Sequence, residues 1–345
     1  MKAFVMSAGI GTRLRPLTYV VPKPMISVAN KPVLEHTLEL LKSHRIKDVV
    51  INLHFKPEII EEYFKSGSGK GVKITYSREQ KLMGTAGGVK KMESVLKDGT
   101  FLIMSGDGLT NVDLTELIKF HRKKKGIATI VLQSIDTRLE YGLAAVGKTG
   151  IIDRFIEKPS WGEVFSGTNT GVNTGIYVFE PEVFKYMPRG REFDFAKELF
   201  PALMKNKKKI FAFFTDAYWC DIGNLSKYRQ CQKDVLEGRA KVNIEGKFRR
   251  GAYIGNGCDI DASVSFSGPA IIGNKCRIKA DVEIGGCSVL GNNLFVDEGA
   301  VVNDCIIWDN VYIGKGVRIE NCIIGKNARV IESISVSDGI IQVNE

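Results

Sequence analysis

The sequence predicts two architectures in succession, an α/β domain followed by a parallel β-helix. Up to about residue 240, short apolar runs alternate with segments of helical periodicity, the pattern of a sheet with helices on both faces. After residue 250, apolar side chains recur every six residues. Such repeats form coils that stack, because no single coil can bury its own apolar face. We therefore expect an N-terminal domain over residues 1–238 and a β-helix over residues 239–345.

The elements expected in the first domain follow from its apolar pattern. Its strands are expected where short apolar runs occur, at residues 4–6, 49–53, 101–104, 128–132 and 175–179. A helix is expected from about residue 32, where leucines fall on one stripe at helical spacing, at positions 34, 38 and 41. Further helices are expected after Asp113 and Asn224, whose side chains suit the N-cap position.

The six-residue repeat defines the second domain. The expected inward positions are Ile254, Ile260, Phe266, Ile272, Ile278, Ile284, Leu290, Val296, Val302, then Ile307, Ile313, Ile319, and then Ile324, Val330 and Val336. A one-residue slip separates each of these three series from the next. Glycine often follows the inward residue and supplies the backbone freedom that a corner needs. This region resembles left-handed hexapeptide-repeat domains over most of residues 250–336.

Composition narrows the class of protein. With 44% hydrophobic and 26% charged residues the chain suits a globular fold. No apolar run approaches the roughly 20 residues of a membrane span. The start of the chain is too short before Gly9 to be a signal peptide, so a cytoplasmic protein without membrane contact is expected. The seven cysteines lack metal-ligand spacing. The five in the repeat, Cys258, Cys276, Cys287, Cys305 and Cys322, are interpreted as reduced core residues.

The net charge of +10 raises the question of nucleic-acid binding. The basic clusters of the chain are residues 122–125, 207–209 and 247–250. They lie at expected helix ends or in connections and are not interleaved with aromatic residues. We therefore expect no nucleic-acid partner. A basic field would instead attract highly charged small substrates.

The residues after the first strand form a glycine turn, Ser7-Ala8-Gly9-Ile10-Gly11-Thr12-Arg13-Leu14. Small residues let backbone N–H groups approach a triphosphate closely. A dinucleotide-binding fingerprint is excluded because Leu14 stands where its third glycine should be. The glycines around Lys70 also fail as a phosphate loop, since Phe64 replaces the first glycine and Gly71 the hydroxyl residue.

The continuation Pro16-Leu17-Thr18-Tyr19-Val20-Val21-Pro22-Lys23-Pro24-Met25 gives this turn its specificity. It resembles the signature of the nucleotide-sugar pyrophosphorylases, the sugar-1-phosphate nucleotidyltransferases. The resemblance implies a Rossmann-like, glycosyltransferase-A-like mixed sheet, with Arg13 and Lys23 as catalytic cations on phosphate oxygens. Ala8 stands where many relatives have glycine, which puts the backbone contact to the base there in doubt.

Other segments resemble the family in the same order along the chain. The implied nucleotide-binding residues are Ala8, Gly9, Gly11, Thr12, Gln80 (with Glu79 as the alternative), Gly84, Thr85 and Gly106. The implied sugar-phosphate-binding residues are Gly142, Glu157, Lys158, Asn173 and Thr174. Asp107 and Asp221 are the implied metal ligands, and two carboxylates with water and phosphate oxygens are what Mg²⁺ prefers.

The resemblance implies transfer of a nucleotidyl group from a nucleoside triphosphate to a sugar 1-phosphate, with release of pyrophosphate. Because residues 157–165, residues 172–177 and the β-helix look most like mannose-1-phosphate guanylyltransferases, GTP and mannose 1-phosphate are the expected substrates. A glucose-1-phosphate uridylyl-, thymidylyl- or adenylyltransferase is the alternative.

Two further alternatives belong to other classes of protein. One is a non-catalytic regulatory relative, which the presence of Arg13, Lys23, Asp107 and Asp221 disfavours. Another is an acyltransferase, since hexapeptide β-helices also perform that chemistry. It usually needs a histidine between coils, and all four histidines precede residue 240. The β-helix is instead expected to form a homo-oligomer, because a solenoid needs a cap or a partner at its edges.

Overall fold

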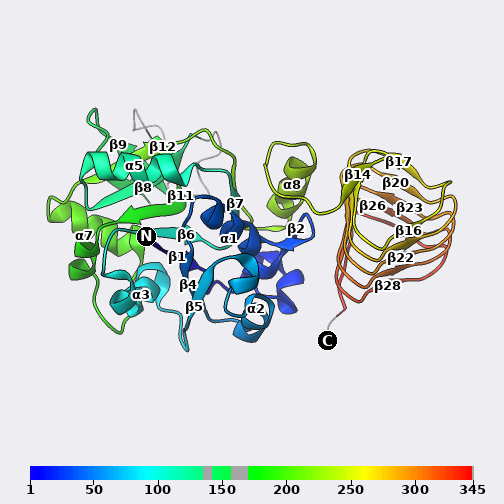
Figure 1. The fold of residues 1–345 in the computed structure, drawn as a ribbon, viewed down its shortest axis with the longest axis horizontal. Coiled ribbons are helices and arrows are strands. Elements are labelled where there is room, and N and C mark those ends of the chain that lie inside the picture. The colour runs from blue at the N-terminus through cyan, green and yellow to red at the C-terminus, as the bar shows by residue number, and fades with distance from the viewer. Residues whose placement is uncertain (135–141, 157–169, 344–345) are drawn as a thin grey trace. The chain divides into compact units, whose positions relative to one another are not determined.

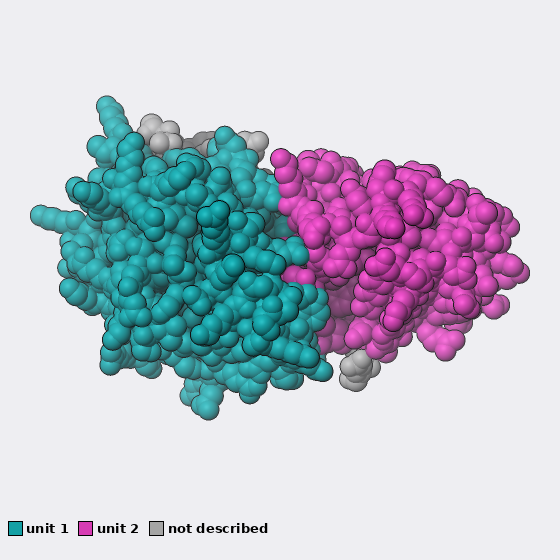
Figure 2. All heavy atoms as spheres, in the orientation of Figure 1, with its two compact units in different colours: residues 1–10, 37–221 teal, residues 11–36, 222–345 magenta. Residues whose placement is uncertain are grey.

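The computed structural model describes residues 1–134, 142–156 and 170–343. The chain divides into two compact units, residues 1–10 with 37–221 and residues 11–36 with 222–345, coloured separately in Figure 2. The first unit contains the α/β sheet, and the second contains the β-helix together with the segment that follows β1. No helix in the described ranges is long and apolar enough to cross a membrane.

A mixed sheet forms the centre of the first unit (Figure 1). Its main path runs β10-β9-β11-β6-β1-β4-β5, and β8 pairs with both β11 and β12. The strands β1, β4, β5 and β6 are parallel, whereas β11 is antiparallel to β6, β8 and β9. The bounds are β1 Lys2–Met6, β4 Asp48–Leu53, β5 Lys73–Arg78, β6 Phe101–Ser105, β8 Ala128–Gln133, β9 Leu143–Val146, β10 Ile152–Ile156, β11 Thr170–Phe179 and β12 Ile210–Phe214.

The expected helices are present. Helix α1, Val33–Ser43, buries the predicted stripe of Leu34, Leu38 and Leu41. Asp113 caps α5 by accepting hydrogen bonds from two N–H groups of its first turn, and Asn224 caps α8, Leu225–Leu236, from the N–H of Lys227. The other helices are α2 Pro57–Phe64, α3 Gly84–Lys91, α4 Glu93–Leu96, α5 Leu114–Lys124 and α7 Phe200–Lys205, with η4 Ser68–Lys70, η5 Pro181–Tyr186 and the π-helix η6 Phe195–Leu199.

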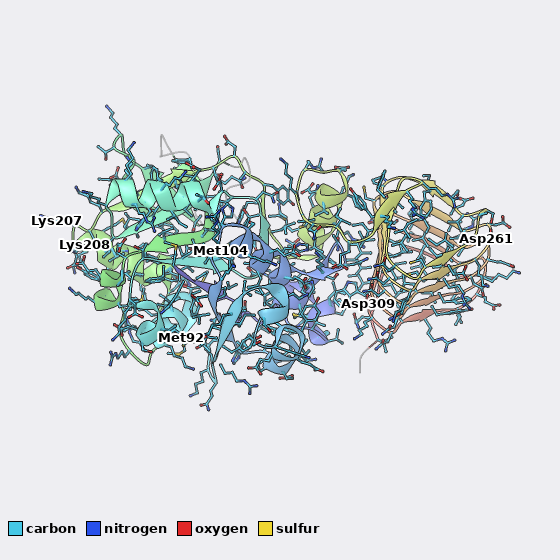
Figure 3. The ribbon with its side chains drawn as sticks, in the orientation of Figure 1. Met92, Met104, Lys207, Lys208, Asp261 and Asp309 are labelled. Atoms are coloured by element: carbon cyan, nitrogen blue, oxygen red, sulfur yellow. The ribbon has the colours of Figure 1, made fainter. Side chains whose placement is uncertain are left out.

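The core of the first unit is built on the parallel strands. Phe4, Phe101 and Ile103 are fully buried and belong to one apolar cluster. Met104 on β6, labelled in Figure 3, is 1% exposed. Strands buried on both faces read as continuous apolar runs, which is why residues 4–6 and 101–104 were recognisable in the sequence.

The C-terminal part of the second unit is a parallel β-helix with three faces (Figure 1). One face contains β14 Lys247–Arg249, β15 Ala252–Ile254, β18 Ala270–Ile272, β21 Ser288–Leu290, β24 Ile306–Ile307, β27 Ile323–Ile324 and β30 Ile340–Ile341. The second contains β16 Asp259–Ile260, β19 Arg277–Ile278, β22 Phe295–Val296, β25 Tyr312–Ile313 and β28 Arg329–Val330. The third contains β17 Ser265–Ser267, β20 Glu283–Gly285, β23 Val301–Asn303, β26 Arg318–Glu320 and β29 Ser335–Ser337.

The predicted inward positions form the β-helix core or pack against it. The slips seen in the sequence are real changes in coil length. Contacts between early coils join residues 18 apart, and those between later coils join residues 17 apart. The shorter step lies between the third face and the first, from Val302 to Ile307 and from Ile319 to Ile324.

The prediction for the cysteines needs one correction. All seven are free thiols. Cys276, Cys305 and Cys322 are buried in the β-helix core and Cys258 packs against it, but Cys287 is only half-buried and is outside that cluster. Cys287 follows Gly286 at a corner, where its N–H donates to the Asp304 carboxylate, so its side chain does not enter the coil.

Corner side chains bind one coil to the next. Asn274 Oδ1 accepts from the N–H of Asn256, and Asn292 Oδ1 accepts from the N–H of Asn274. Asp309 continues the ladder by accepting from the N–H of Asn292 at 2.7 Å; Figure 3 labels this residue. At another corner position Asn310 has a φ of 59°, in the left-handed region that asparagine tolerates better than most residues.

Candidate active site

Two aspartates meet at the carboxyl end of the parallel strands. Asp107 follows β6, and the next strand, β7 Gly108–Thr110, pairs with β13, Trp219–Asp221. In this pairing Asp221 lies opposite Gly108, the neighbour of Asp107. The hydroxyl of Ser105 donates a hydrogen bond to the Asp107 carboxylate and orients it. The pairing of two short strands therefore brings together residues that are far apart in the sequence.

This donor set fits Mg²⁺. Within the described ranges no group of three or more histidine, cysteine, aspartate or glutamate side chains could surround a metal ion. A metal held here would rest on two carboxylates and take its other oxygen ligands from water and substrate. Mg²⁺ is commonly bound in this way, whereas structural zinc requires four protein ligands.

The predicted sugar-binding strand carries an irregularity at the residues of interest. The register between β11 and β8 shifts between Asn173 and Tyr177. Asn173 Oδ1 accepts from the N–H of Gly175, its Nδ2 donates to the Tyr177 hydroxyl, and its N–H donates to the Gly142 carbonyl at 2.8 Å. The Thr174 hydroxyl is buried and donates to a carbonyl of β8. Bulges of this kind re-aim side chains and are frequent beside active sites.

A buried polar network joins the ends of three strands. The N–H of Ser7, after β1, donates to Asn52 Oδ1 at 2.7 Å, and Asn52 Nδ2 donates to Glu79 Oε1 at 2.8 Å. Glu79 Oε2 accepts from the N–H of Met83 at 3.0 Å. Gly88 leaves room for them, because a Cβ there would lie 2.5 Å from Glu79 Oε1. Glu79 is 5% exposed, whereas the neighbouring Gln80 is exposed.

The segment leading into α3 is held against residues before η6. Gly84 has a φ of +69°, and a Cβ on it would lie 2.6 Å from the Phe193 carbonyl oxygen. The Thr85 hydroxyl donates to the Asp194 carboxylate at 2.9 Å and accepts from the N–H of Phe195. The predicted nucleotide residues Gly84 and Thr85 therefore have fixed backbones, with the Thr85 hydroxyl engaged inside the protein.

In the second unit, the glycine turn folds back onto Lys23. Gly11 has a φ of +71°, and a Cβ on it would lie 2.9 Å from Lys23 Cβ. The Thr18 hydroxyl donates to the Gly11 carbonyl at 2.8 Å. Short 3-10 helices, η1 Thr12–Leu14, η2 Leu17–Tyr19 and η3 Lys23–Met25, build the segment between. Lys23 is 9% exposed, whereas Arg13 is exposed, so the two predicted cations have different surroundings.

The hairpin after Lys23, with strands β2 Ser27–Val28 and β3 Lys31–Pro32, is fixed by α8 and by the β-helix. Buried Gln232 accepts from the N–H of Ala29 at 2.9 Å and donates to the Ser27 carbonyl at 2.8 Å. Asn30 Nδ2 donates to the Leu290 carbonyl at 2.7 Å. The Tyr228 hydroxyl also donates to Ser27 and accepts from Trp308 Nε1, and burial raises the pKa of this tyrosine. The β-helix thus supports the predicted phosphate-binding segment.

The remaining predicted site residues differ in how exposed they are. Ala8 is buried, whereas Gly9 and Thr12 are exposed. Gly106 lies beside Ser7, since a Cβ on it would come 2.3 Å from Ser7 Oγ. Glu157 and Lys158 lie outside the described residues.

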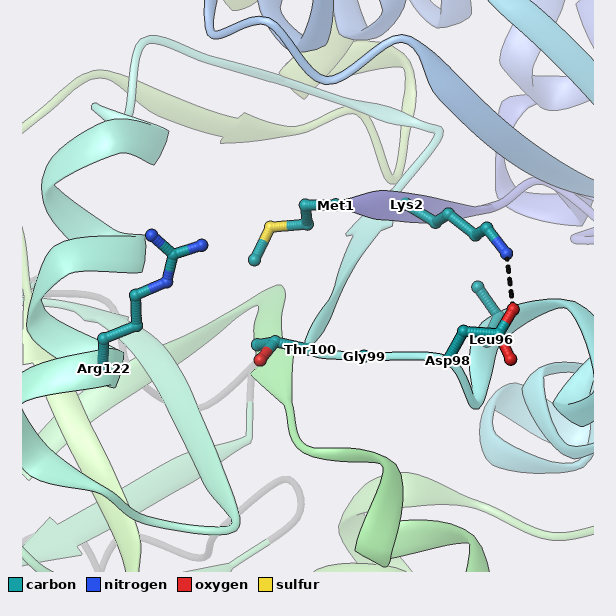
Figure 4. A pocket seen from close by; sticks show the side chains of 7 residues that line it. All are labelled: Met1, Lys2, Leu96, Asp98, Gly99, Thr100 and Arg122. Carbon is teal, nitrogen blue, oxygen red and sulfur yellow. Dashed lines mark hydrogen bonds and ion pairs between the residues drawn. The ribbon is translucent and has the colours of Figure 1, made fainter.

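A pocket of about 260 Å³ lies at the opposite, amino end of β1 and β6 (Figure 4). There Lys2 binds Asp98, and Met1, Leu96, Gly99, Thr100 and Arg122 complete the lining. None of the predicted site residues lines this pocket.

Sequence reasoning did not assign roles to Asn52 and Ser105. Asn52 is 3% exposed and interrupts the apolar run Val49–Leu53 near its end, a run that otherwise reads as a fully buried strand. A polar residue at the carboxyl end of such a strand was the available signal, because open α/β sheets bind ligands there. Ser105 occupies the same position on β6.

Comparisons with known proteins agree with this arrangement. Residues 2–238 match the family described as nucleotidyl transferase, and residues 236–344 match the GMPPB C-terminal domain. The chain is 38% identical to a UTP–glucose-1-phosphate uridylyltransferase of Synechocystis sp., over 90% of this chain and 83% of the relative. It is 33% identical to a probable mannose-1-phosphate guanylyltransferase 2 of Oryza sativa subsp. japonica, over 77% of this chain and 76% of the relative.

Solved structures share the fold at lower identity. A putative glucose-1-phosphate thymidylyltransferase from Bacillus anthracis superposes with a TM-score of 0.62 at 23% identity, over 72% of this chain and 98% of that chain. The two family matches, the relatives matched over most of their length and the paired strand-end aspartates lead to the same conclusion. The chain belongs to the nucleotidyl transferase family and is a sugar-1-phosphate nucleotidyltransferase.

Proposed function

We propose that this enzyme transfers a guanylyl group from GTP to mannose 1-phosphate, giving GDP-mannose and pyrophosphate. The observation that carries the nucleotidyl-transfer chemistry is the pairing of β7 with β13, which sets Asp221 opposite the neighbour of Asp107. The choice of GTP and mannose is supported by the relatives named mannose-1-phosphate guanylyltransferase and by the match to the GMPPB C-terminal domain.

The proposed reaction is a single in-line displacement. A phosphate oxygen of the sugar 1-phosphate forms a bond to the α-phosphorus, while the bond from that phosphorus to the bridging oxygen of pyrophosphate breaks. No protein nucleophile is needed, so positioning and charge perform the catalysis. Bound Mg²⁺ would neutralise phosphate charge and orient the reacting oxygens.

The chain's own residues take distinct parts. Asp107 and Asp221 hold the metal, and Ser105 fixes the orientation of Asp107. Arg13 stabilises the charge that develops on the α-phosphate and the pyrophosphate. Lys23 and Lys158 hold the sugar phosphate. Gly11 has a left-handed backbone conformation and lies so close to Lys23 that a side chain would not fit. Its backbone can therefore approach the triphosphate without a side chain in the way.

UTP and glucose 1-phosphate form the second candidate pair. The relative named UTP–glucose-1-phosphate uridylyltransferase is 38% identical and covers 90% of this chain, more than the guanylyltransferase relatives cover. A base-contacting segment that accepts uracil would leave the proposed metal and phosphate contacts unchanged, because those contacts involve no base.

The deciding experiment measures pyrophosphate release by purified protein with Mg²⁺, using GTP, UTP, dTTP and ATP, each with mannose and glucose 1-phosphates. We expect the highest kcat/KM with GTP and mannose 1-phosphate. A preference for UTP and glucose 1-phosphate would replace the substrate assignment and keep the mechanism. No release from any pair would contradict catalysis and favour a regulatory role.

The β-helix is further proposed to make a homo-oligomer. Its last coil leaves large apolar side chains exposed, with Ile331 at 65%, Ile334 at 38% and Val343 at 41%. A second copy covering this end would remove them from water. Light scattering at micromolar concentration tests the proposal, and a monomeric mass would contradict it.

A further inference from the structure

The hydroxyl of Ser7 is a buried polar group with no partner in the described part of the chain. Ser7 is 4% exposed, and its Oγ makes no hydrogen bond to any described residue. A buried hydroxyl without a partner costs free energy, and such groups are uncommon in native proteins. An unpartnered hydroxyl in a reactive place therefore indicates a missing ligand atom.

The place is the carboxyl end of the central strands. Met6 pairs with Ser105 in the parallel register of β1 and β6, so the next residues, Ser7 and Gly106, are neighbours. The absence of a side chain at Gly106 is what makes room, since a Cβ there would lie 2.3 Å from Ser7 Oγ. Gly106 precedes the metal-binding candidate Asp107. Ser7 itself leads into the glycine turn.

The backbone of Ser7 is fixed independently of its hydroxyl. Its N–H donates to Asn52, which donates to Glu79, which in turn accepts from Met83. Only a carboxylate can serve at position 79, because both of its oxygens accept. The Asn52 amide suits position 52, because it accepts from the N–H of Ser7 through Oδ1 and donates to Glu79 through Nδ2. The hydroxyl is thus held in place, buried and without a protein partner among the described residues.

We propose that Ser7 is a nucleotide-binding residue whose hydroxyl donates a hydrogen bond to a phosphate oxygen of the nucleoside triphosphate. A phosphate oxygen is the fitting acceptor, because the hydroxyl lies beside Gly106 and one step from Asp107. This assignment rests on the proposed role of the glycine turn and of Asp107 in binding the metal–triphosphate. Asn52 and Glu79 act as positioning residues for Ser7.

A matched pair of variants tests the assignment. Ser77 on β5 is 3% exposed, and its hydroxyl also makes no hydrogen bond to described residues. Ser7→Ala and Ser77→Ala therefore remove the same kind of group at two places. In both, the melting temperature without ligands should stay the same or rise, because an unsatisfied buried hydroxyl is removed.

The nucleotide kinetics should separate the two variants. With the substrate pair that the wild type uses, Ser7→Ala should lower kcat/KM for the nucleotide by about 10-fold to 100-fold, the range for a hydrogen bond to a charged acceptor. Its KM for the sugar 1-phosphate should not change. Ser77→Ala should stay within about twofold of the wild type. A Ser7→Ala enzyme with wild-type constants, or one with a clearly lowered melting temperature, would overturn the assignment.

A binding measurement keeps this test separate from the test of the proposed function. Calorimetric titration of GTP and of UTP with Mg²⁺ reports on Ser7 even if the wild type turns over no sugar phosphate. Weaker nucleotide binding by Ser7→Ala, with Ser77→Ala unchanged, supports the assignment. Equal binding by all three proteins, or no nucleotide binding by the wild type, overturns it.

Discussion

The β-helix and the α/β sheet use polar residues in opposite ways. In the β-helix, equivalent side chains repeat from coil to coil, so that Asn274 performs for Asn256 the task that Asn292 performs for Asn274. In the sheet, Asn52, Glu79 and Ser105 each make contacts that no other residue repeats. Repeated contacts stabilise the β-helix and make it recognisable in the sequence, whereas a catalytic site depends on contacts that are each made only once. The following variants test that contrast, from the largest expected effect to the smallest.

A cavity in the β-helix should affect stability alone. Ile307 is 1% exposed in the middle of the coil stack, and Ile307→Ala should lower the free energy of unfolding by about 2–5 kcal/mol. Denaturant unfolding measures this. The kcat at a temperature well below the transition should stay near the wild-type value. A large loss of kcat in the folded variant would show that the coils take a direct part in catalysis.

Removing a predicted catalytic cation should have the reverse effect. Arg13 is exposed, so Arg13→Ala should leave the melting temperature nearly unchanged. Turnover should fall on the order of 100-fold to 1000-fold, as for loss of one transition-state donor. Arg122→Ala, at the amino end of the sheet, is the control and should remain active. Equal rates for Arg13→Ala and the wild type would remove Arg13 from the mechanism.

Gln232 is expected to affect both properties, because it joins α8 to the hairpin after Lys23, in the predicted phosphate-binding segment. Gln232→Ala leaves the N–H of Ala29 without its partner, whereas the Ser27 carbonyl keeps the hydrogen bond from Tyr228, so the loss should cost about 1–3 kcal/mol. The hairpin after Lys23 should loosen, and KM for the sugar 1-phosphate, which Lys23 is proposed to hold, should rise. Gln230→Ala, exposed on the same helix, is the control. An unchanged KM in Gln232→Ala would mean that the hairpin is not coupled to binding of the sugar phosphate.

The smallest expected effect is a dependence of stability on pH that comes from His121. His121 is 1% exposed, beside Thr129 and Glu180, and burial lowers its pKa below 6.5. As pH falls through 6.5, the unfolded chain takes up a proton that the folded protein does not. Stability should therefore be full above pH 6.5 and decline below it, by at most about 1.4 kcal/mol per pH unit. Denaturant unfolding of wild type and His121→Gln at pH 7.5 and 5.5 checks this, and identical losses in both would contradict it.

Sequence patterns predicted the helices and strands better than they predicted which strands lie next to one another in the sheet. The stripe of leucines in α1, the caps at Asp113 and Asn224 and the inward positions of the coils are all present, because each depends on residues close in the chain. The position of β11 between β6, β8 and β9 was not predictable, since strand order depends on contacts between distant segments. The reduced burial of Cys287 was missed for a related reason, because corner geometry decides it.

The candidate site shows the same limit. Asp107 and Asp221 could be selected from family resemblance, but their meeting depends on β7 and β13, two strands of three residues without a clear apolar pattern. The network from Ser7 to Met83 joins three strand ends, and hydrogen bonds between distant polar side chains leave no periodic signal. The roles of Arg13, Lys23, Gly84 and Thr85 in catalysis or binding remain predictions for the assays above.

The change in coil length at one corner implies that the β-helix is modular. A single residue lost between the third face and the first is absorbed there, as the step from Val302 to Ile307 shows. A residue lost within a face would turn every later side chain of that strand to the opposite side. Excision or duplication of one whole coil should keep each ladder intact. The length of this domain is therefore free to change in complete turns, as long as the coils that carry Leu290 and Trp308, which hold the hairpin after Lys23 and α8, are kept.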